Sequence, residues 1–359
     1  MNTKKSGIDR SGESGATSAD ETRAKLDRLQ SELDDLQESL LLTDVRNEME
    51  EIETTLSLLP AEVEQVRARG YVFRSFLENK VDVLAGQWDE ARDRTFREIR
   101  ERQRELEREA DAAASALQRA MSGRASQVSR AESAINTLER KVEAAQAAVG
   151  AMYQTLQQNV DQTHSQVEEI RWLLEQVDEA SFQLHPAEDP IAACKAQYME
   201  TKKEGPKGVL YLTDERLVFE QKEEKATKKV LFVTTAKETV QELIFAVPVG
   251  QIEGSQASDE GFLGRKEMLE LRFGPQADLS GATIRLRGSA DNEEWAGLIG
   301  RVMSGEIGKE RTQPKEESAL EAARAVPTKC PTCGATLSIE IVRGMREITC
   351  EYCGSVIRL

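Results

Sequence analysis

The sequence predicts a multidomain protein of the α plus β class, with a long helical region, a β-rich domain that ends in one helix, and a small cysteine-rich module. Three observations support this class: apolar residues recur at steps of three and four in the first half, they alternate after Pro186, and four of the five cysteines lie near the end. We expect five segments: a disordered tail at 1–20, a helical region at 21–182, a β-rich domain at 187–305, a linker at 306–328 and a cysteine-rich module at 329–359.

The helical region carries an apolar stripe at coiled-coil spacing. Leu26, Leu29 and Leu33 begin the stripe, which slips in phase after Leu40 and resumes at Leu42. Its later members lie at the same spacing: Phe96, Ile99, Leu106, Leu117, Ile135, Leu138, Val142, Ile170 and Leu173. The pattern predicts long helices with one apolar face each.

Two positions are expected to interrupt these helices. Pro60 is expected to end the first helix, because proline has no backbone N–H to donate. Residues 122–126 contain Gly123 and are the expected break between later helices. The region is then either one rod or a helical hairpin. We expect a coiled coil that self-associates, with polar seam residues such as Gln103 setting the register; a compact bundle with its own core is the alternative.

The four late cysteines form two Cys-x-x-Cys pairs, each followed by glycine. Cys330 and Cys333 are the first pair, and Cys350 and Cys353 are the second. Four thiolates at this spacing suit one tetrahedral Zn²⁺ and leave no open position for a catalytic water, so we expect a single structural zinc ion. A pair of disulfides is the alternative. The module resembles the zinc ribbon family, and it is too small to fold without the metal, which contributes roughly 10 to 16 kcal/mol in such modules.

The sequence between the two cysteine pairs fits a β-hairpin. Ala335, Leu337, Ile339 and Val342 alternate before a turn at 343–346, and Ile348 continues the pattern on the way back. The last strand is expected at 355–359. The hairpin would bring the second pair of cysteines next to the first.

The β-rich domain begins with a hairpin at 208–219, in which a polar turn separates two apolar runs. Further strands are expected at 229–235, 240–247, 252–257, 267–273 and 282–287, followed by a helix at 291–303 with Trp295 on its apolar face. The motif Gly-x-Leu-Tyr-Leu-Thr-x-x-Arg-Leu-x-Phe at 208–219 resembles the GRAM and pleckstrin-homology-like (PH-like) family. This resemblance implies a β-barrel capped by the C-terminal helix, and a lipid- or protein-binding module.

A lipid-binding surface would need basic side chains on open loops. Lys202, Lys203 and Lys207 are the candidates, but Glu200 and Glu204 flank them and weaken the local positive field. A second basic run has the residues Lys225, Lys228 and Lys229, and it also has acidic neighbours, namely Glu220, Glu223 and Glu224. Most of these charges are therefore interpreted as solvated loop residues.

Three other reactive side chains are interpreted as ordinary residues. Cys194 lies in an apolar run and is expected to be a small buried hydrophobic residue of the first strand. His164 and His185 are the only histidines, and we interpret both as lacking acidic or cysteine neighbours at ligand spacing. None of the three is expected to bind a metal or to act as a nucleophile.

Composition and charge narrow the classes of function. The 359 residues carry a net charge of −16, and residues 1–185 hold 36 acidic against 24 basic residues, so binding to DNA or RNA phosphates is disfavoured. No apolar run approaches the roughly 20 residues of a membrane span, and no secretory signal is recognised, so we expect a cytoplasmic protein with at most peripheral membrane contact. No catalytic motif is found, and we expect no enzyme activity.

These observations favour a non-enzymatic scaffold or adaptor. It would self-associate as a homo-oligomer through the coiled coil and dock an unidentified protein partner through the PH-like and zinc-ribbon modules. One alternative is a peripheral membrane protein that binds anionic lipid through the PH-like domain. A second is a nucleic-acid-associated protein that uses the zinc ribbon.

Overall fold

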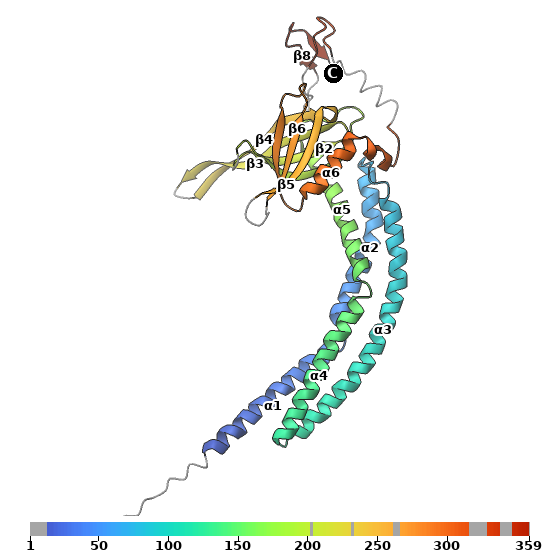
Figure 1. Cartoon of the computed structure of the whole chain (residues 1–359), viewed down its shortest axis with the longest axis vertical. Helices are drawn as coiled ribbons and strands as arrows, with labels where there is room; N and C mark the ends of the chain where they lie inside the picture. The colour runs from blue at the N-terminus through green and yellow to red at the C-terminus, as the bar shows by residue number, and fades with distance from the viewer. Residues whose placement is uncertain are drawn as a thin grey trace, which may run out of the picture. The chain divides into compact units, whose positions relative to one another are not determined.

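The computed structural model describes two compact units of the chain (Figure 1). One contains Met1–Leu59 with Lys80–Thr163, and the other contains Pro60–Asn79 with His164–Leu359. The described residues are 13–201, 204–230, 233–260, 266–315, 329–337 and 347–358.

Five helices occupy the region of the apolar stripe. They are α1 (Glu13–Ser39), α2 (Thr43–Ala68), α3 (Leu77–Ala120), α4 (Ala125–Gly150) and α5 (Gln154–Glu179). Helix α1 begins inside the segment that was expected to be a disordered tail. Within the described part of the chain, no helix is both long and apolar enough to pass through a lipid bilayer.

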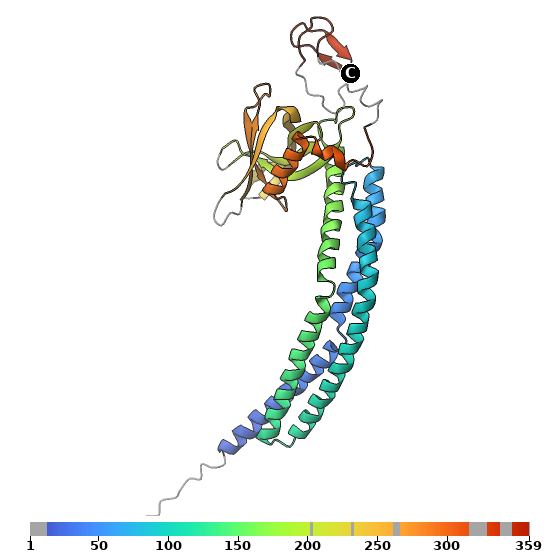
Figure 2. The same ribbon diagram turned by 45° about the vertical axis from the view of Figure 1, so that its right-hand side comes forward.

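The first unit buries its apolar stripes inside a single chain. Figures 1 and 2 show α4 running alongside α3, and α1 packs on α4. Leu138 of α4 is completely buried, and Leu33 of α1 is 2% exposed. Ion pairs join neighbouring helices at the surface: Lys25 with Glu132 at 2.7 Å, Glu53 with Arg92 at 2.9 Å, and Glu109 with Lys141 at 2.6 Å. The stripe is therefore covered without a second chain, as in the folded-back arrangement.

One of the two predicted interruptions of the helices is wrong, and the other is confirmed. Pro60 lies inside α2, so the expectation that it ends the first helix is wrong. Its neighbours Leu59 and Val63 are 0% and 3% exposed, and this burial offsets the lost hydrogen bond and the steric clash, which cost about 3 kcal/mol. The break lies instead at the phase slip, where buried Leu42 adopts a left-handed φ of 50°. The break expected at 122–126 is confirmed: Gly123, with a φ of 74°, lies in the turn between α3 and α4.

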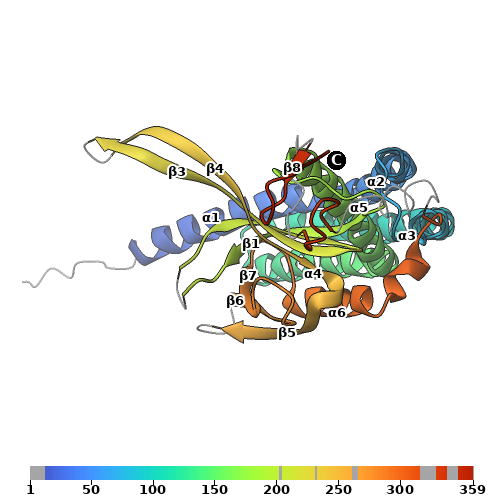
Figure 3. The same ribbon diagram turned by 90° about the horizontal axis from the view of Figure 1, so that it is seen from above.

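The second unit contains a seven-stranded antiparallel sheet with the strand order β4-β3-β2-β1-β7-β6-β5. The strands are β1 (Pro190–Tyr198), β2 (Lys207–Thr213), β3 (Arg216–Val230), β4 (Val233–Pro248), β5 (Ile252–Glu260), β6 (Lys266–Phe273) and β7 (Gly281–Leu286). The predicted hairpin at 208–219 is confirmed by β2 and the start of β3. Of the strand expected at 229–235, residues 229–230 end β3 and 233–235 begin β4, while 231 and 232 lie outside the described residues. Figure 3 shows β3 and β4 running out from the sheet together.

The sheet is not closed, so the expectation of a β-barrel is wrong. Strands β4 and β5 are its two edges and are not hydrogen-bonded to each other. Strand β4 ends at Pro248, which has no N–H to donate, and the short 3-10 helix η1 (Val249–Gln251) then redirects the chain before β5. The edges therefore diverge where closure would need them to pair.

Helix α6 (Asn292–Met303) follows the sheet, as predicted. Asp291 caps its first turn by accepting a hydrogen bond from the backbone N–H of Glu294 at 2.8 Å. Trp295 and Ile299 are 7% and 0% exposed, and the helix packs against β5, where the Ser255 hydroxyl donates to the Ala296 carbonyl at 3.1 Å. This helix covers one edge of the open sheet.

A buried ion pair fixes the path of the chain from α5 into the sheet. Glu188 precedes β1, Arg216 begins β3, and their side chains are 0% and 3% exposed. The guanidinium donates from Nε to Oε1 at 3.0 Å and from Nη2 to Oε2 at 2.8 Å. Thr213 donates to Oε1 at 2.6 Å, and the backbone N–H of His185 donates to Oε2 at 2.7 Å. The buried carboxylate thus has four donors.

A second buried carboxylate holds the end of α5 against the sheet. Glu220 of β3 is completely buried and accepts from the backbone N–H of Ser181 at 2.6 Å and from Gln241 at 3.1 Å. The Tyr211 hydroxyl donates to it at 3.1 Å. Strand β3 therefore carries two buried charged residues, Arg216 and Glu220, that position the end of α5.

The segment after α6 returns to the same unit. It forms a 3-10 helix, η3 (Glu306–Glu310), within the segment that was expected to be a linker. Arg311 then pairs with Asp189 and, at 3.0 Å, with Asp214, and its guanidinium lies 4.9 Å from the ring centre of Phe73. The backbone N–H of Thr312 donates to the carbonyl of Val72 at 2.8 Å. Residues 306–315 are therefore a strap that joins the sheet to the loop between α2 and α3.

Gly208 in β2 allows a close approach of two strands, and we expect Gly208→Ala to destabilise the second unit. A Cβ at this position would lie 1.8 Å from the backbone carbonyl oxygen of Glu220, which cannot move without shifting β3. We expect a loss of about 1–3 kcal/mol or more in the free energy of unfolding, measured by urea denaturation. Gly297→Ala is the matched control, because a Cβ there meets nothing within 4 Å and alanine favours a helix. Equal stabilities of the two variants would contradict this packing.

Candidate metal centre

The two cysteine pairs lie on two turns with the same hydrogen-bond pattern. In the first, Gly334 N–H donates to the Cys330 carbonyl at 2.8 Å; in the second, Gly354 N–H donates to the Cys350 carbonyl at 2.8 Å. Both glycines need a positive φ, of 73° and 71°, to close the turn. The chain therefore builds the same turn twice, and each turn carries two thiols.

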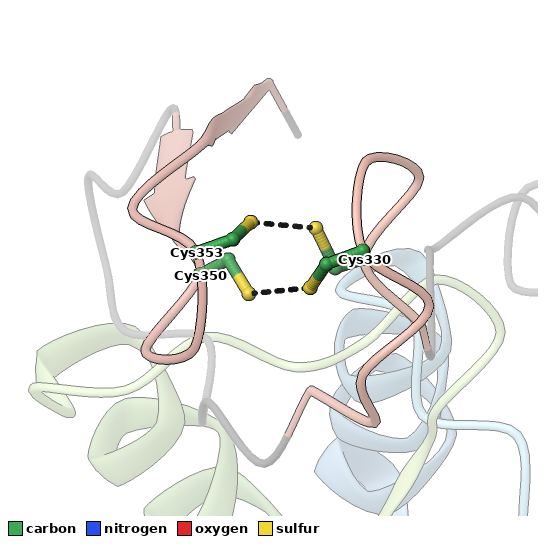
Figure 4. A group of neighbouring side chains, drawn as sticks. Cys330, Cys350 and Cys353 are labelled. Carbon is green, nitrogen blue, oxygen red and sulfur yellow. Dashed lines mark hydrogen bonds between the residues drawn. The ribbon is translucent and has the colours of Figure 1, made fainter.

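The four thiols face one another across the gap between these turns (Figure 4). The Sγ atoms of Cys330 and Cys353 are 3.6 Å apart, as are those of Cys333 and Cys350, and all four lie within 4.8 Å of one another. Four sulfurs at about 2.3 Å from a tetrahedral Zn²⁺ are about 3.8 Å apart. The sequence-predicted ligands are thus brought together at separations that fit one metal ion, and none of the cysteines is in a disulfide.

Hydrogen bonds favour the thiolate form at Cys330 and Cys353, whereas the neighbouring thiols outweigh the Ala335 backbone hydrogen bond and raise the pKa of Cys333. The Ser355 hydroxyl lies 3.2 Å from the Sγ of Cys330 and 3.1 Å from the Sγ of Cys353. This hydroxyl, together with backbone N–H groups that include that of Thr332, lowers the pKa of Cys330 to about 5, and the Ser355 hydroxyl also lowers the pKa of Cys353. Thiolates bind divalent metals, so the hydrogen bonds from Ser355 prepare one thiol of each turn, Cys330 and Cys353, for this chemistry.

A very small apolar core supports the metal-binding turns. Strands β8 (Glu347–Thr349) and β9 (Val356–Arg358) pair antiparallel, in the region where the last strand was predicted. The buried residues are Cys330, Ile348, Cys350 and Ile357, with Ala335 and Leu337 packed against them. Of the predicted hairpin, Ile339, Val342 and the turn at 343–346 lie outside the described residues.

The fifth cysteine is confirmed as a buried hydrophobic residue. Cys194 lies in β1, is 6% exposed, and has its thiol pKa raised by burial. It is neither a nucleophile poised as a thiolate nor part of the four-thiol cluster.

The interpretation of the histidines is wrong, because each lies beside two carboxylates. His164 Nε2 is 3.8 Å from oxygens of Glu62 and Glu168. His185 Nδ1 is 3.8 Å from Glu188 and 3.6 Å from Glu215. Glu168 and Glu188 are four and three residues after their histidines, a spacing that the sequence already contained. The other two carboxylates come from elsewhere in the chain.

Only part of the candidate lipid-binding surface lies within the described residues. Lys207 is exposed at the start of β2, and Glu200 and Glu204 are exposed on the preceding loop. Lys202 and Lys203 lie outside the described residues, as do the side chains of the second basic run. The structure therefore places one of the three lysines and both acidic neighbours on the surface.

A cavity of about 450 Å³ in the second unit was not predicted from the sequence. It lies among α5, β1 and the start of α6, and its lining includes Trp172, Leu173, Ile191, Cys194, Trp295 and Leu298. Charged residues, among them Arg74, Arg287 and Glu294, complete the lining. No sequence signal could have found the cavity, because it depends on the packing of three separate elements.

Comparison with known proteins gives structural neighbours and no family. No protein-family model and no curated protein sequence matches this chain. The N-terminal PH domain of Vps36 is 17% identical over 36% of this chain and 89% of its own, with a TM-score of 0.23. The DH/PH domains of PDZ-RhoGEF, solved with activated RhoA, are 10% identical over 76% of this chain and 94% of their own, with a TM-score of 0.28. The hSac2 domain of the human phosphoinositide phosphatase Sac2 is 10% identical over 35% of this chain and 74% of its own, with a TM-score of 0.23.

We expect Cys330→Ser to abolish the binding of one metal ion per chain. Serine replaces a soft thiolate with a weak oxygen ligand, so the tetrahedral set is broken and the small module loses its main source of stability. Elemental analysis after dialysis against Zn²⁺ measures the stoichiometry. Cys194→Ala is the control, because this cysteine is buried in β1 away from the cluster, and it should keep the metal. Unchanged zinc affinity in Cys330→Ser would refute the four-thiol site.

Proposed function

We propose that this chain is a non-enzymatic adaptor whose cysteine module holds one structural Zn²⁺. The observation that carries the proposal is the set of four thiols within 4.8 Å of one another. Four protein ligands fill the tetrahedral shell of zinc, and a metal held in this way stabilises a fold but has no position for a substrate. The module would then present its surface turns to a partner. Zinc binding and the absence of enzyme activity are both part of the proposal.

The second part of the proposal is that the open sheet and α6 form a PH-like docking module. A four-stranded meander, a three-stranded meander and a final helix, in that order, support this assignment. The buried Glu188–Arg216 pair fixes the module to the exit from α5, and the Arg311 strap fixes it to the loop between α2 and α3, which suits a surface that binds another protein. We favour a protein over a lipid as its ligand, because Glu200 and Glu204 are exposed near Lys207.

We expect the full-length protein not to float with anionic or neutral liposomes, even at low salt, because acidic residues offset the basic loop. The charge-reversal variant Lys202→Glu, Lys203→Glu, Lys207→Glu should then behave as the wild type does. Its matched control reverses three exposed arginines of α3, with the changes Arg97→Glu, Arg100→Glu and Arg104→Glu. If the wild type and the arginine control float with anionic vesicles and the lysine variant does not, the proposal of protein docking is wrong. The module would then be a peripheral membrane-binding module.

Self-association through the helical unit stays a prediction. Because the apolar stripes are covered within one chain, a homo-oligomer would have to use exposed apolar residues such as Leu58 and Val83, which are 53% and 48% exposed. We expect light scattering to give a mass above 40.0 kDa that rises with concentration. The double variant Leu58→Lys, Val83→Lys should lower that mass. A monomer mass for the wild type at all concentrations would show that the adaptor acts as a single chain.

A further inference from the structure

A second group of metal-ligating side chains lies in the unit that contains the sheet, on its helical part. His164 and Glu168 are one turn apart on α5 and therefore share a face of the helix. Glu62 reaches the same place from α2. One ligand atom from each residue lies within 4.8 Å of the other two, and His164 Nε2 is 3.8 Å from Glu62 Oε2 and 3.8 Å from Glu168 Oε1. One nitrogen and two carboxylates thus converge on one point.

The Glu62 carboxylate has an oxygen that no described group satisfies. Its side chain is 16% exposed, yet Oε2 is buried and has no hydrogen-bond partner. The other oxygen, Oε1, lies 3.4 Å from Arg171. A buried carboxylate oxygen without a donor costs free energy, and this one is directed at His164. A cation bound between Glu62 and His164 would remove that cost.

Arg171 contacts both carboxylates, at Glu62 Oε1 and at Glu168 Oε1, and leaves Glu62 Oε2 without a hydrogen bond. Its guanidinium pairs with Glu168 as well as with Glu62. Partners of this kind orient the ligands in many metal sites. His164 and Glu168 are 43% and 45% exposed, so an ion and its remaining water ligands could reach the group from solvent.

The other histidine provides an internal comparison. His185 also lies beside two carboxylates, Glu188 and Glu215. However, both oxygens of Glu188 already accept hydrogen bonds, from Thr213, His185 N–H and Arg216, and Glu188 is fully buried. Glu215 pairs with Lys315 at 3.4 Å. These carboxylates have structural partners, whereas Glu62 has a free oxygen, so the two groups differ in their capacity for a metal.

We propose that Glu62, His164 and Glu168 form a binding site for one divalent transition-metal ion, separate from the four-thiol centre. An imidazole with two carboxylates suits Zn²⁺ or Co²⁺, and three protein ligands leave a position for water. The present separations of 3.8 Å would have to shorten slightly, since ligands about 2.1 Å from a tetrahedral ion are about 3.4 Å apart. His164 and Glu168, which are exposed on one face of α5, can make this adjustment by rotation.

The test is the zinc stoichiometry of the full-length chain, measured by equilibrium dialysis against Zn²⁺ and elemental analysis. We expect two zinc ions per wild-type chain, and we expect Cys330→Ser to lose only the ion of the four-thiol centre. His164→Asn and Glu62→Gln should each weaken the second site by at least about tenfold, because each removes one of three ligands with little change in size. Circular dichroism checks that both variants remain folded.

His185→Asn is the matched control and should keep both ions. Co²⁺ added to protein already loaded with one zinc should give the weak visible absorption of nitrogen and oxygen ligands and not the strong thiolate bands. The proposal is overturned if the wild type binds one zinc only, in which case the group is an ion-pair network. It is also overturned if the second ion persists in His164→Asn or is lost in His185→Asn.

Discussion

The buried pair of Glu188 and Arg216 is the interaction on which the sheet-containing unit depends. The two residues lie on either side of β1 and β2, so their contact joins the exit from α5 to the start of β3. Removing one partner from a buried pair typically costs about 3–5 kcal/mol, because the other charge is left without a counter-charge. Here Arg216 also lies 5.8 Å from the ring centre of Phe182, so charge and packing act at one point. The strap is anchored beside this pair, because Arg311 binds Asp189 and Asp214, which lie close in sequence to Glu188 and Arg216.

The cysteine module follows a different principle. Its apolar core is only a few side chains, so hydrophobic burial cannot fold it, and the proposed zinc ion would supply the missing free energy. The sheet-containing unit instead satisfies buried charges with named donors and packs aromatic residues such as Phe219 and Phe245 with ring centres 6.0 Å apart. One chain therefore carries two docking candidates with independent sources of stability, and loss of metal should affect only one of them.

Local patterns predicted most of the elements and the four metal ligands, whereas contacts between distant residues escaped prediction. The cysteines were found because each pair needs only a short turn, and α6 was found because its cap and apolar face are local. Pro60 was misjudged because the burial of Leu59 and Val63 is decided by other helices. The prediction of a barrel was wrong because closure depends on whether the two edge strands, β4 and β5, pair with each other. His164 was misinterpreted although Glu168 is one turn away, because Glu62 comes from another helix.

The β3–β4 hairpin has a consequence for solubility. Strand β2 pairs with β3 only up to Gln221, whereas β3 and β4 stay paired as far as Val230 and Val233, so the outer hairpin is a two-stranded ribbon with two open edges. Open strand edges invite pairing with the same ribbon of another molecule. The sequence at 222–230, Lys-Glu-Glu-Lys-Ala-Thr-Lys-Lys-Val, places charges at most positions, and stacking two such ribbons edge to edge would bring like charges together. The charge-rich sequence of this segment is thus well suited to keep an open strand edge from aggregating.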